Sequence, residues 1–197
     1  MKTSILLIPL FCTTCCFGQK QIVFRKGINV LHNLQHHVLT RLQKDFDFSI
    51  VYAPWSAWDS SPNYYILAKK GDSLFAFRYH QRIMADIPIE IQDTGLHQVK
   101  VAKITLEGLL KTIIKNDLSN LKEETNDSHG CPGDGCQIVD AAHKCFYIIN
   151  KEGHRYLHYY APDYYEGCCP GSSARVSISK CAKVFVKTFM YKGAYLE

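Results

Sequence analysis

The stretch YYILAKKGDSLFAFRY, Tyr64–Tyr79, predicts the element around which the rest of the chain is organised. Two runs of aromatic and aliphatic residues flank a short polar corner, which is typical of two antiparallel strands joined by a tight turn. A turn centred on Lys70 and Gly71 pairs Ile66 with Phe75. Both faces of the resulting hairpin are apolar, so we expect it inside a sheet that is covered on both sides.

A second stretch, FYIINKEGHRYLHYY at Phe146–Tyr160, resembles the first when the chain is shifted by 82 positions without a gap. Four pairs of residues are then identical: Tyr65, Ile66, Lys69 and Gly71 with Tyr147, Ile148, Lys151 and Gly153. Two explanations are open: a degenerate tandem repeat of a helix followed by a hairpin, or two buried hairpins of similar composition.

The composition indicates a folded globular chain of 197 residues, of which 47% are hydrophobic and 21% are charged. This length suffices for one good core or two small ones. The net charge is +5, but no run of Lys or Arg exceeds two residues and no basic stripe alternates with aromatic residues. The charge pattern therefore argues against a nucleic-acid partner.

The first 18 residues have the pattern of an export signal. Lys2 supplies a short basic region, and Ile5–Phe11 form an apolar core. Small side chains at Cys16 and Gly18, positions −3 and −1 of a cleavage site, favour cleavage after Gly18. The apolar run is too short to span a bilayer, no second one occurs, and no cysteine has a good lipobox before it. We therefore predict a protein without a transmembrane segment that is exported to the periplasm or secreted.

Six cysteines remain after such a cleavage, all in the last third of the chain: Cys131, Cys136, Cys145, Cys168, Cys169 and Cys181. In an exported chain an even number predicts disulfides, here three, with 15 connectivities open. Cys131 and Cys136 bracket a tight loop that a local disulfide could close. Cys168 and Cys169 are expected to reach different partners, since bonding to each other would strain the chain. The spacing fits structural zinc poorly, so no metal or other cofactor is predicted.

Helical and strand periodicities alternate along the chain outside the two hairpins. The predicted elements are a helix over Asn29–Asp45, a strand over Phe46–Tyr52, a loop over Ala53–Pro62, an edge strand around Ile87–Ile91, a strand over Gln98–Ile104, a helix over Thr105–Leu121 and a last helix from Ser173. This order predicts an α+β fold with helices packed on an antiparallel sheet.

The predicted division of the chain is a signal peptide over 1–18, a first helix-hairpin unit with the second helix over 19–125, and a cysteine-rich second hairpin with the last helix over 126–197. The polar stretch Lys122–Gly135 is the predicted connector. We expect the two parts to form one continuous domain.

The sequence carries none of the motifs that mark a nucleophilic serine, a phosphate loop or a calcium loop. His154 and His158 share one face of a predicted strand, and Asp163 and Glu166 follow closely. These four residues could supply the acid and base of a small secreted hydrolase. We favour the simpler explanation, in which the two histidines lie on a solvated strand face and the two carboxylates lie in a soluble loop.

Aromatic residues in two predicted loops are the best candidates for a binding surface: Trp55, Trp58, Tyr160, Tyr164 and Tyr165. Rings held on rigid loops make good anchors for a protein or a carbohydrate, although a tryptophan can also fold back over the core. We therefore predict an exported, disulfide-stabilised binding or inhibitor-like protein, more plausibly than an enzyme. A small secreted hydrolase and an envelope structural protein are the alternatives, and the oligomeric state is open.

Overall fold

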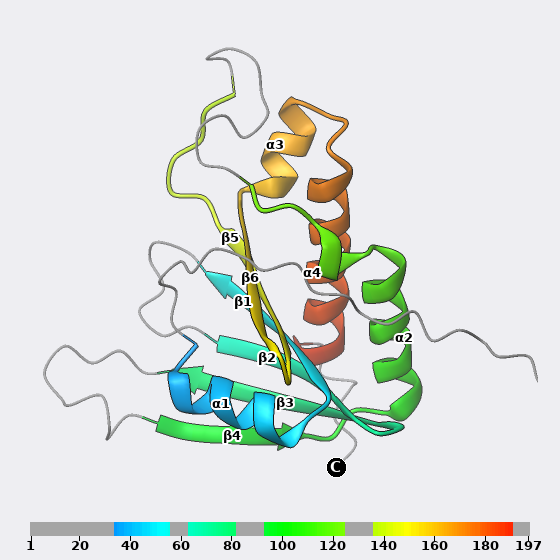
Figure 1. The fold of residues 1–197 in the computed structure, drawn as a ribbon. Helices are drawn as coiled ribbons and strands as arrows, with labels where there is room; N and C mark the ends of the chain where they lie inside the picture. The colour runs from blue at the N-terminus through cyan, green and yellow to red at the C-terminus, as the bar shows by residue number, and fades with distance from the viewer. Residues whose placement is uncertain (1–33, 56–62, 82–92, 125–135, 191–197) are drawn as a thin grey trace, which may run out of the picture.

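The structure, a computed structural model, describes residues 34–55, 63–81, 93–124 and 136–190. Within these ranges the fold is α+β: four α-helices pack on a six-stranded antiparallel sheet with strand order β4-β3-β2-β1-β5-β6 (Figure 1). The strands are β1 (Phe48–Trp55), β2 (Asn63–Lys70), β3 (Ser73–Gln81), β4 (Asp93–Val99), β5 (His143–Asn150) and β6 (Gly153–Tyr160). The helices are α1 (His36–Asp45), α2 (Lys103–Lys115), α3 (Pro162–Cys168), α4 (Ser173–Met190) and the short 3-10 helix η2 (Leu118–Asn120).

Helices cover both faces of the central strands, as the apolar hairpin predicts. In β1 the side chains of Ile50 and Tyr52 join the cluster under α2 and α4, while Val51 and Ala53 join the cluster under α1. Neighbouring residues of a strand point to opposite faces, so a strand with two covered faces needs apolar residues at every position. The fold thus has three layers, α1, sheet, and α2 with α4 (Figure 1).

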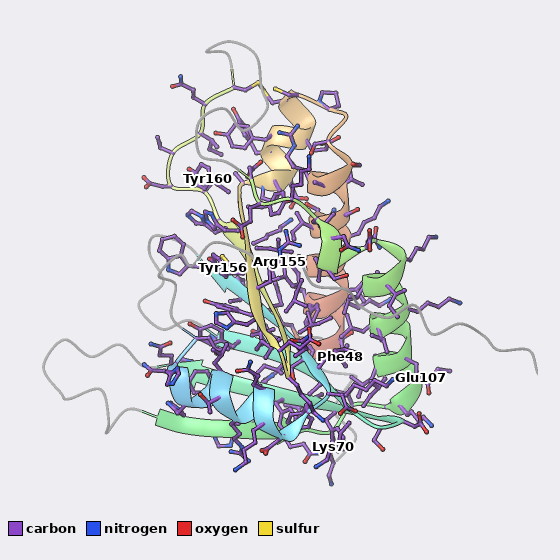
Figure 2. All side chains as sticks on the ribbon, in the orientation of Figure 1. Phe48, Lys70, Glu107, Arg155, Tyr156 and Tyr160 are labelled. Atoms are coloured by element: carbon purple, nitrogen blue, oxygen red, sulfur yellow. A yellow bond between two sulfur atoms is a disulfide. The ribbon has the colours of Figure 1, made fainter. Side chains whose placement is uncertain are left out.

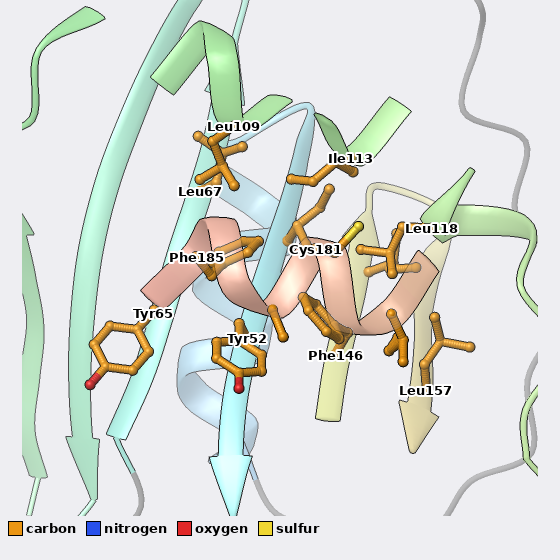
Figure 3. Packing of buried hydrophobic residues seen from close by; sticks show 14 of the residues in the cluster. Tyr52, Tyr65, Leu67, Leu109, Ile113, Leu118, Phe146, Leu157, Cys181 and Phe185 are labelled. Atoms are coloured by element: carbon orange, nitrogen blue, oxygen red, sulfur yellow. The ribbon is translucent and has the colours of Figure 1, made fainter. Parts of the chain in front are cut away.

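The larger cluster is centred on α4 (Figure 3). The ring of Phe185 lies 5.7 Å, between centroids, from both Tyr52 of β1 and Phe146 of β5. Leu109 of α2 closes the cluster from the side, and Leu67 of β2 forms its floor. Burial of each such side chain contributes about 1.5–3 kcal/mol, so this layer holds the sheet and the two helices together.

The turn of the first hairpin differs from its prediction by one position. β2 ends at Lys70 and β3 begins at Ser73, so Gly71 and Asp72 form the turn, and Ile66 pairs with Phe77 instead of Phe75. Gly71 has a φ of +56°, a left-handed conformation that glycine adopts without strain. A change of two residues in pairing leaves every side chain on its face, so the apolar pattern cannot distinguish the two registers.

The tandem repeat is not confirmed. The turn of the second hairpin consists of Lys151 and Glu152, between the end of β5 and the start of β6. The gapless shift lays Gly71, a turn residue, over Gly153, which is already the first residue of β6. The two hairpins are therefore out of register in the matched sequence.

Proline does not end the first strand, contrary to the predicted loop over Ala53–Pro62. β1 continues to Trp55, and Pro54 pairs with Lys144 of β5. Among the described residues, the pairing of β1 with β2 stops at Tyr52, whereas the pairing of β1 with β5 continues to Trp55. A residue without an N–H donor fits such a position.

The strand predicted over Gln98–Ile104 is wrong, because β4 already ends at Val99 and α2 begins at Lys103. α2 then ends at Lys115 instead of Leu121. Asp117, in a left-handed conformation with φ 51°, turns the chain into η2. The predicted edge strand over Ile87–Ile91 and the predicted helix start at Asn29 lie outside the described residues.

None of the helices that the structure describes is long and apolar enough to cross a membrane.

Candidate functional site

Residues at three neighbouring strand ends point their side chains to the face of the sheet that α1 covers. Trp55 at the end of β1 pairs with His143 at the start of β5, and His143 pairs with Tyr160 at the end of β6. Trp55 lies two residues after Ala53, His143 lies two residues before Cys145, and Tyr160 lies four residues after Tyr156. Ala53, Cys145 and Tyr156 all belong to the α1-side cluster. Because side chains alternate along a strand, Trp55, His143 and Tyr160 lie on that same face.

The side chains of these strand ends form a contiguous cluster around His143. Its ring lies 4.4 Å from Trp55, 4.8 Å from Tyr160 and 4.8 Å from His158, measured between ring centroids. The Nδ1 atom of His143 is 2.6 Å from the Nε2 atom of His158, so one nitrogen donates a hydrogen bond to the other. All four side chains are half-buried. We call Trp55, His143, His158 and Tyr160 the aromatic–histidine patch.

Two buried residues, Tyr156 and Cys145, lie beneath the patch, and neither is ionised at neutral pH. Tyr156 stacks on His158, with centroids 6.2 Å apart and planes 9° apart, and its hydroxyl donates to the Sγ atom of Cys145 at 3.1 Å. Tyr156 and Tyr160 lie on the α1 side of β6, whereas Arg155 lies on the opposite side, where its guanidinium donates to the Ser119 carbonyl of η2 (Figure 2). Burial raises the pKa of Cys145 to about 12 and the pKa of Tyr156 well above its ordinary value. The two residues therefore supply no nucleophile.

The tyrosines of the predicted site hold a neighbouring segment in place. The Tyr160 hydroxyl accepts a hydrogen bond from the Ala141 N–H at 3.2 Å and donates one to the Ile138 carbonyl at 2.9 Å. The Tyr164 hydroxyl donates to the Gln137 carbonyl at 3.2 Å. These bonds fix residues 136–142, which we call the 136–142 segment, at the flank of the patch.

The predicted binding residues thus divide into three groups. Trp55 and Tyr160 come together in the patch. Tyr165 is buried and packs under Tyr160, while the half-exposed ring of Tyr164 packs on Tyr165. Trp58 lies outside the described residues. Sequence reasoning missed His143, although its place two residues before Cys145 on one face of the strand could have indicated it.

The residues of the hydrolase alternative do not converge. His158 is in the patch, but His154 is exposed and pairs with Ile149 near the other end of β6. Asp163 forms an ion pair with Lys144, whose Nζ atom also donates to the Ser179 hydroxyl of α4 at 3.1 Å. Lys144 follows His143 in β5, so it points to the opposite face of the sheet. The arrangement contradicts a shared acid–base site.

The two carboxylates have structural roles instead. Partial burial acts to raise the pKa of Asp163, but hydrogen bonds from Lys144 and Ser179 outweigh it and the pKa is lowered. Glu166 accepts hydrogen bonds from the Gly171 N–H at 2.7 Å and the Ser172 N–H at 3.2 Å, which lower its pKa. Glu166 therefore fixes the turn between α3 and α4.

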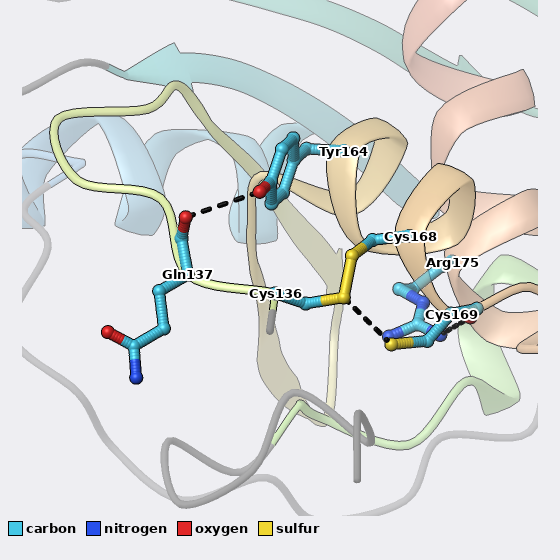
Figure 4. Close-up of a disulfide and its surroundings, with 6 residues drawn as sticks. All are labelled: Cys136, Gln137, Tyr164, Cys168, Cys169 and Arg175. Carbon is cyan, nitrogen blue, oxygen red and sulfur yellow. Dashed lines mark hydrogen bonds between the residues drawn. A yellow bond between two sulfur atoms is a disulfide. The ribbon is translucent and has the colours of Figure 1, made fainter. Parts of the chain in front are cut away.

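Cys136 and Cys168 form a disulfide with their Cα atoms 6.1 Å apart (Figure 4). It joins the start of the 136–142 segment to the end of α3 and replaces the predicted local bond from Cys136 to Cys131. Cys169 is also disulfide-bonded, and its Sγ atom lies 3.5 Å from that of Cys136. Cys168 and Cys169 are not bonded to each other, as predicted.

Two of the six predicted disulfide cysteines are free. Cys145 is buried under the patch on the α1 side, and Cys181 of α4 is buried on the other side of the sheet. The sheet separates the two thiols, and each packs as a small apolar side chain. Burial raises the pKa of Cys181 to about 12, as for Cys145. The predicted set of three disulfides is therefore wrong for these two residues.

Comparisons of the chain with protein-family models, with curated proteins and with solved structures found no match.

Proposed function

We propose that this protein is exported and acts by binding a protein partner through the aromatic–histidine patch. One observation carries the proposal: the rings of Trp55, His143 and Tyr160 are packed on one another at adjacent strand ends, yet each remains half-exposed. Rings that are already fixed lose little conformational freedom when a partner covers them, and Trp and Tyr are the commonest anchors at protein interfaces.

The surroundings of the patch favour a protein over a carbohydrate. The hydroxyl groups of Tyr160 and Tyr164 are engaged with backbone atoms of the 136–142 segment, so they are poorly placed to bond the many hydroxyls of a sugar. The same segment carries Val139, whose side chain is 83% exposed. Apolar side chains beside aromatic anchors match the composition of a protein interface.

Two further observations support the proposal. The Cys136–Cys168 disulfide ties the flank of the patch to α3, and such bonds persist in oxidising compartments. This agrees with the export that we propose from the N-terminal sequence pattern. Helices cover both faces of the central strands, which disfavours an envelope scaffold built on an exposed apolar sheet.

The test is site-specific photo-crosslinking in the producing cells, with a photoreactive phenylalanine in place of Trp55. The matched control places it at Ile104 of α2, which is 78% exposed and lies in the layer on the other side of the sheet. The proposal predicts a protein adduct at position 55 that is absent at position 104. The partner is then purified and its binding confirmed with the unmodified chain.

Two results would contradict the proposal. Equal labelling at both positions would mean that the patch has no preferred partner. No protein adduct, together with Trp55-dependent binding to a glycan panel, would replace the protein partner by a carbohydrate.

A further inference from the structure

A second cluster of reactive side chains lies apart from the aromatic rings, at the end of α3. The sulfur atoms of Cys136, Cys168 and Cys169 all lie within 4.8 Å of one another (Figure 4). All three are in disulfides in this structure. We propose that, when these disulfides are reduced, the three sulfurs form a binding site for a thiolate-preferring divalent ion of the Zn²⁺ class.

The spacing of the sulfur atoms fits such an ion. Thiolates about 2.3 Å from a tetrahedral zinc are about 3.8 Å from each other. The Cys136 and Cys169 sulfurs are 3.5 Å apart, and no pair in the cluster exceeds 4.8 Å. Once the Cys136–Cys168 bond opens, its two sulfurs need only separate to the same spacing. Three ligands leave a fourth position for water or another small ligand.

The backbone that carries the sulfurs is fixed independently of the disulfides. Glu166 accepts hydrogen bonds from two backbone N–H groups of the following turn and pairs with Arg175 at 3.3 Å. The guanidinium of Arg175 donates to the Cys169 carbonyl at 2.6 Å, and Tyr164 holds the residue after Cys136. The three sulfurs are therefore expected to stay close together after reduction, which lowers the entropic cost of metal binding.

The local charge also suits a thiolate site. Three thiolates and one divalent ion leave one net negative charge. Arg175 is 4% exposed and lies beside Cys169, so its positive charge acts at short range in a poorly hydrated place. Its partner Glu166 offsets part of this charge, but it also prevents the guanidinium from turning away.

Each disulfide accepts two electrons and two protons from a dithiol reductant, which itself closes to a disulfide. The freed thiols then lose their protons to solvent as the ion binds, so loading is favoured by higher pH. Oxidation reverses the sequence and releases the ion, which makes the disulfides and the metal alternative states of the same three cysteines.

The test uses the full exported chain, oxidised or reduced with a phosphine that does not bind zinc, and titrated with Co²⁺ and then Zn²⁺. The proposal predicts a thiolate-to-cobalt absorption band in the reduced protein only, which Zn²⁺ abolishes. Zn²⁺ also protects Cys136, Cys168 and Cys169 from alkylation, as read by peptide mass spectrometry. Each single change of these cysteines to Ser lowers the affinity for Zn²⁺ by at least about tenfold.

The matched control is the double variant Cys145→Ser and Cys181→Ser, which removes the two buried thiols and should bind Zn²⁺ as the wild type does. Absence of the cobalt band, or protection from alkylation at Cys145 and Cys181 instead, would overturn the proposal. The alkylation experiment uses the wild-type chain, so a variant that fails to fold does not decide the result. Partner binding is tested on the oxidised protein, so this site and the proposed function can fail separately.

Discussion

Replacing His143 by Ala should destabilise the protein although the side chain is only half-buried. His143 contacts each other member of the aromatic–histidine patch, Trp55, His158 and Tyr160. The variant therefore tests whether the patch is held together before any partner binds.

The magnitude follows from the contacts that are lost. The hydrogen bond between the imidazoles of His143 and His158 contributes about 1 kcal/mol. Three ring contacts contribute about 0.5–1.5 kcal/mol each when buried, and we take about 1 kcal/mol in total for rings at a half-exposed site. The expected loss is thus about 2 kcal/mol, a substantial part of the 5–15 kcal/mol that is typical of a domain.

The assay is equilibrium unfolding in urea with circular dichroism and tryptophan fluorescence as parallel probes. With a slope near 2 kcal/mol per molar urea, the midpoint should fall by about 1 M. His154→Ala is the matched control, since His154 is exposed on the same side of the sheet and should cost less than about 0.5 kcal/mol. Equal midpoints for the two variants would refute the idea of a preorganised patch.

Two further predictions concern ionisable groups elsewhere. A hydrogen bond from the Gly71 N–H and an ion pair with Lys151 lower the pKa of Asp47 below its ordinary value of 3.8. The Asp47 carboxylate therefore stabilises the fold fully above pH 3.8, and this stabilisation is lost as the pH falls through the lowered pKa. Asp47→Asn should therefore unfold more readily than the wild type at pH 7, and the two melting temperatures should converge once the pH falls through the lowered pKa of Asp47. A constant difference down to acid pH would contradict this. The thiols of Cys145 and Cys181, with pKa values of about 12, should resist iodoacetamide at pH 8 in the native protein and react after unfolding, as peptide mass spectrometry can show. Rapid native labelling of either would be inconsistent with its burial.

The fold class could be predicted because the signals that decide it are local. Apolar residues at successive positions of Tyr64–Tyr79 require a strand pair covered on both faces, and the helical stripe through Val38 and Leu42 supplies one of the covering elements. The exact pairing could not be predicted. Pairing Ile66 with Phe75 or with Phe77 leaves the same residues on the same faces, so the apolar pattern is compatible with both registers.

The candidate site could be predicted only in part, because it depends on which strand ends become neighbours. Trp55 and Tyr160 are far apart in the sequence, and they meet through His143 because β5 pairs with both β1 and β6. The number of cysteines was likewise insufficient to predict which of them form disulfides. The count is even, but it does not reveal that the sheet places Cys145 and Cys181 on opposite faces.

The most direct test of the proposed binding surface is the dissociation constant of the purified, crosslink-identified partner, measured by calorimetry for the wild type and for Trp55→Ala. Truncating a central aromatic anchor should weaken binding at least about tenfold, equivalent to about 1.4 kcal/mol, while Ile104→Ala binds as the wild type does. The melting temperature of each variant shows whether it is folded under the conditions of the titration. Unchanged affinity in folded Trp55→Ala would place the binding surface elsewhere on the protein.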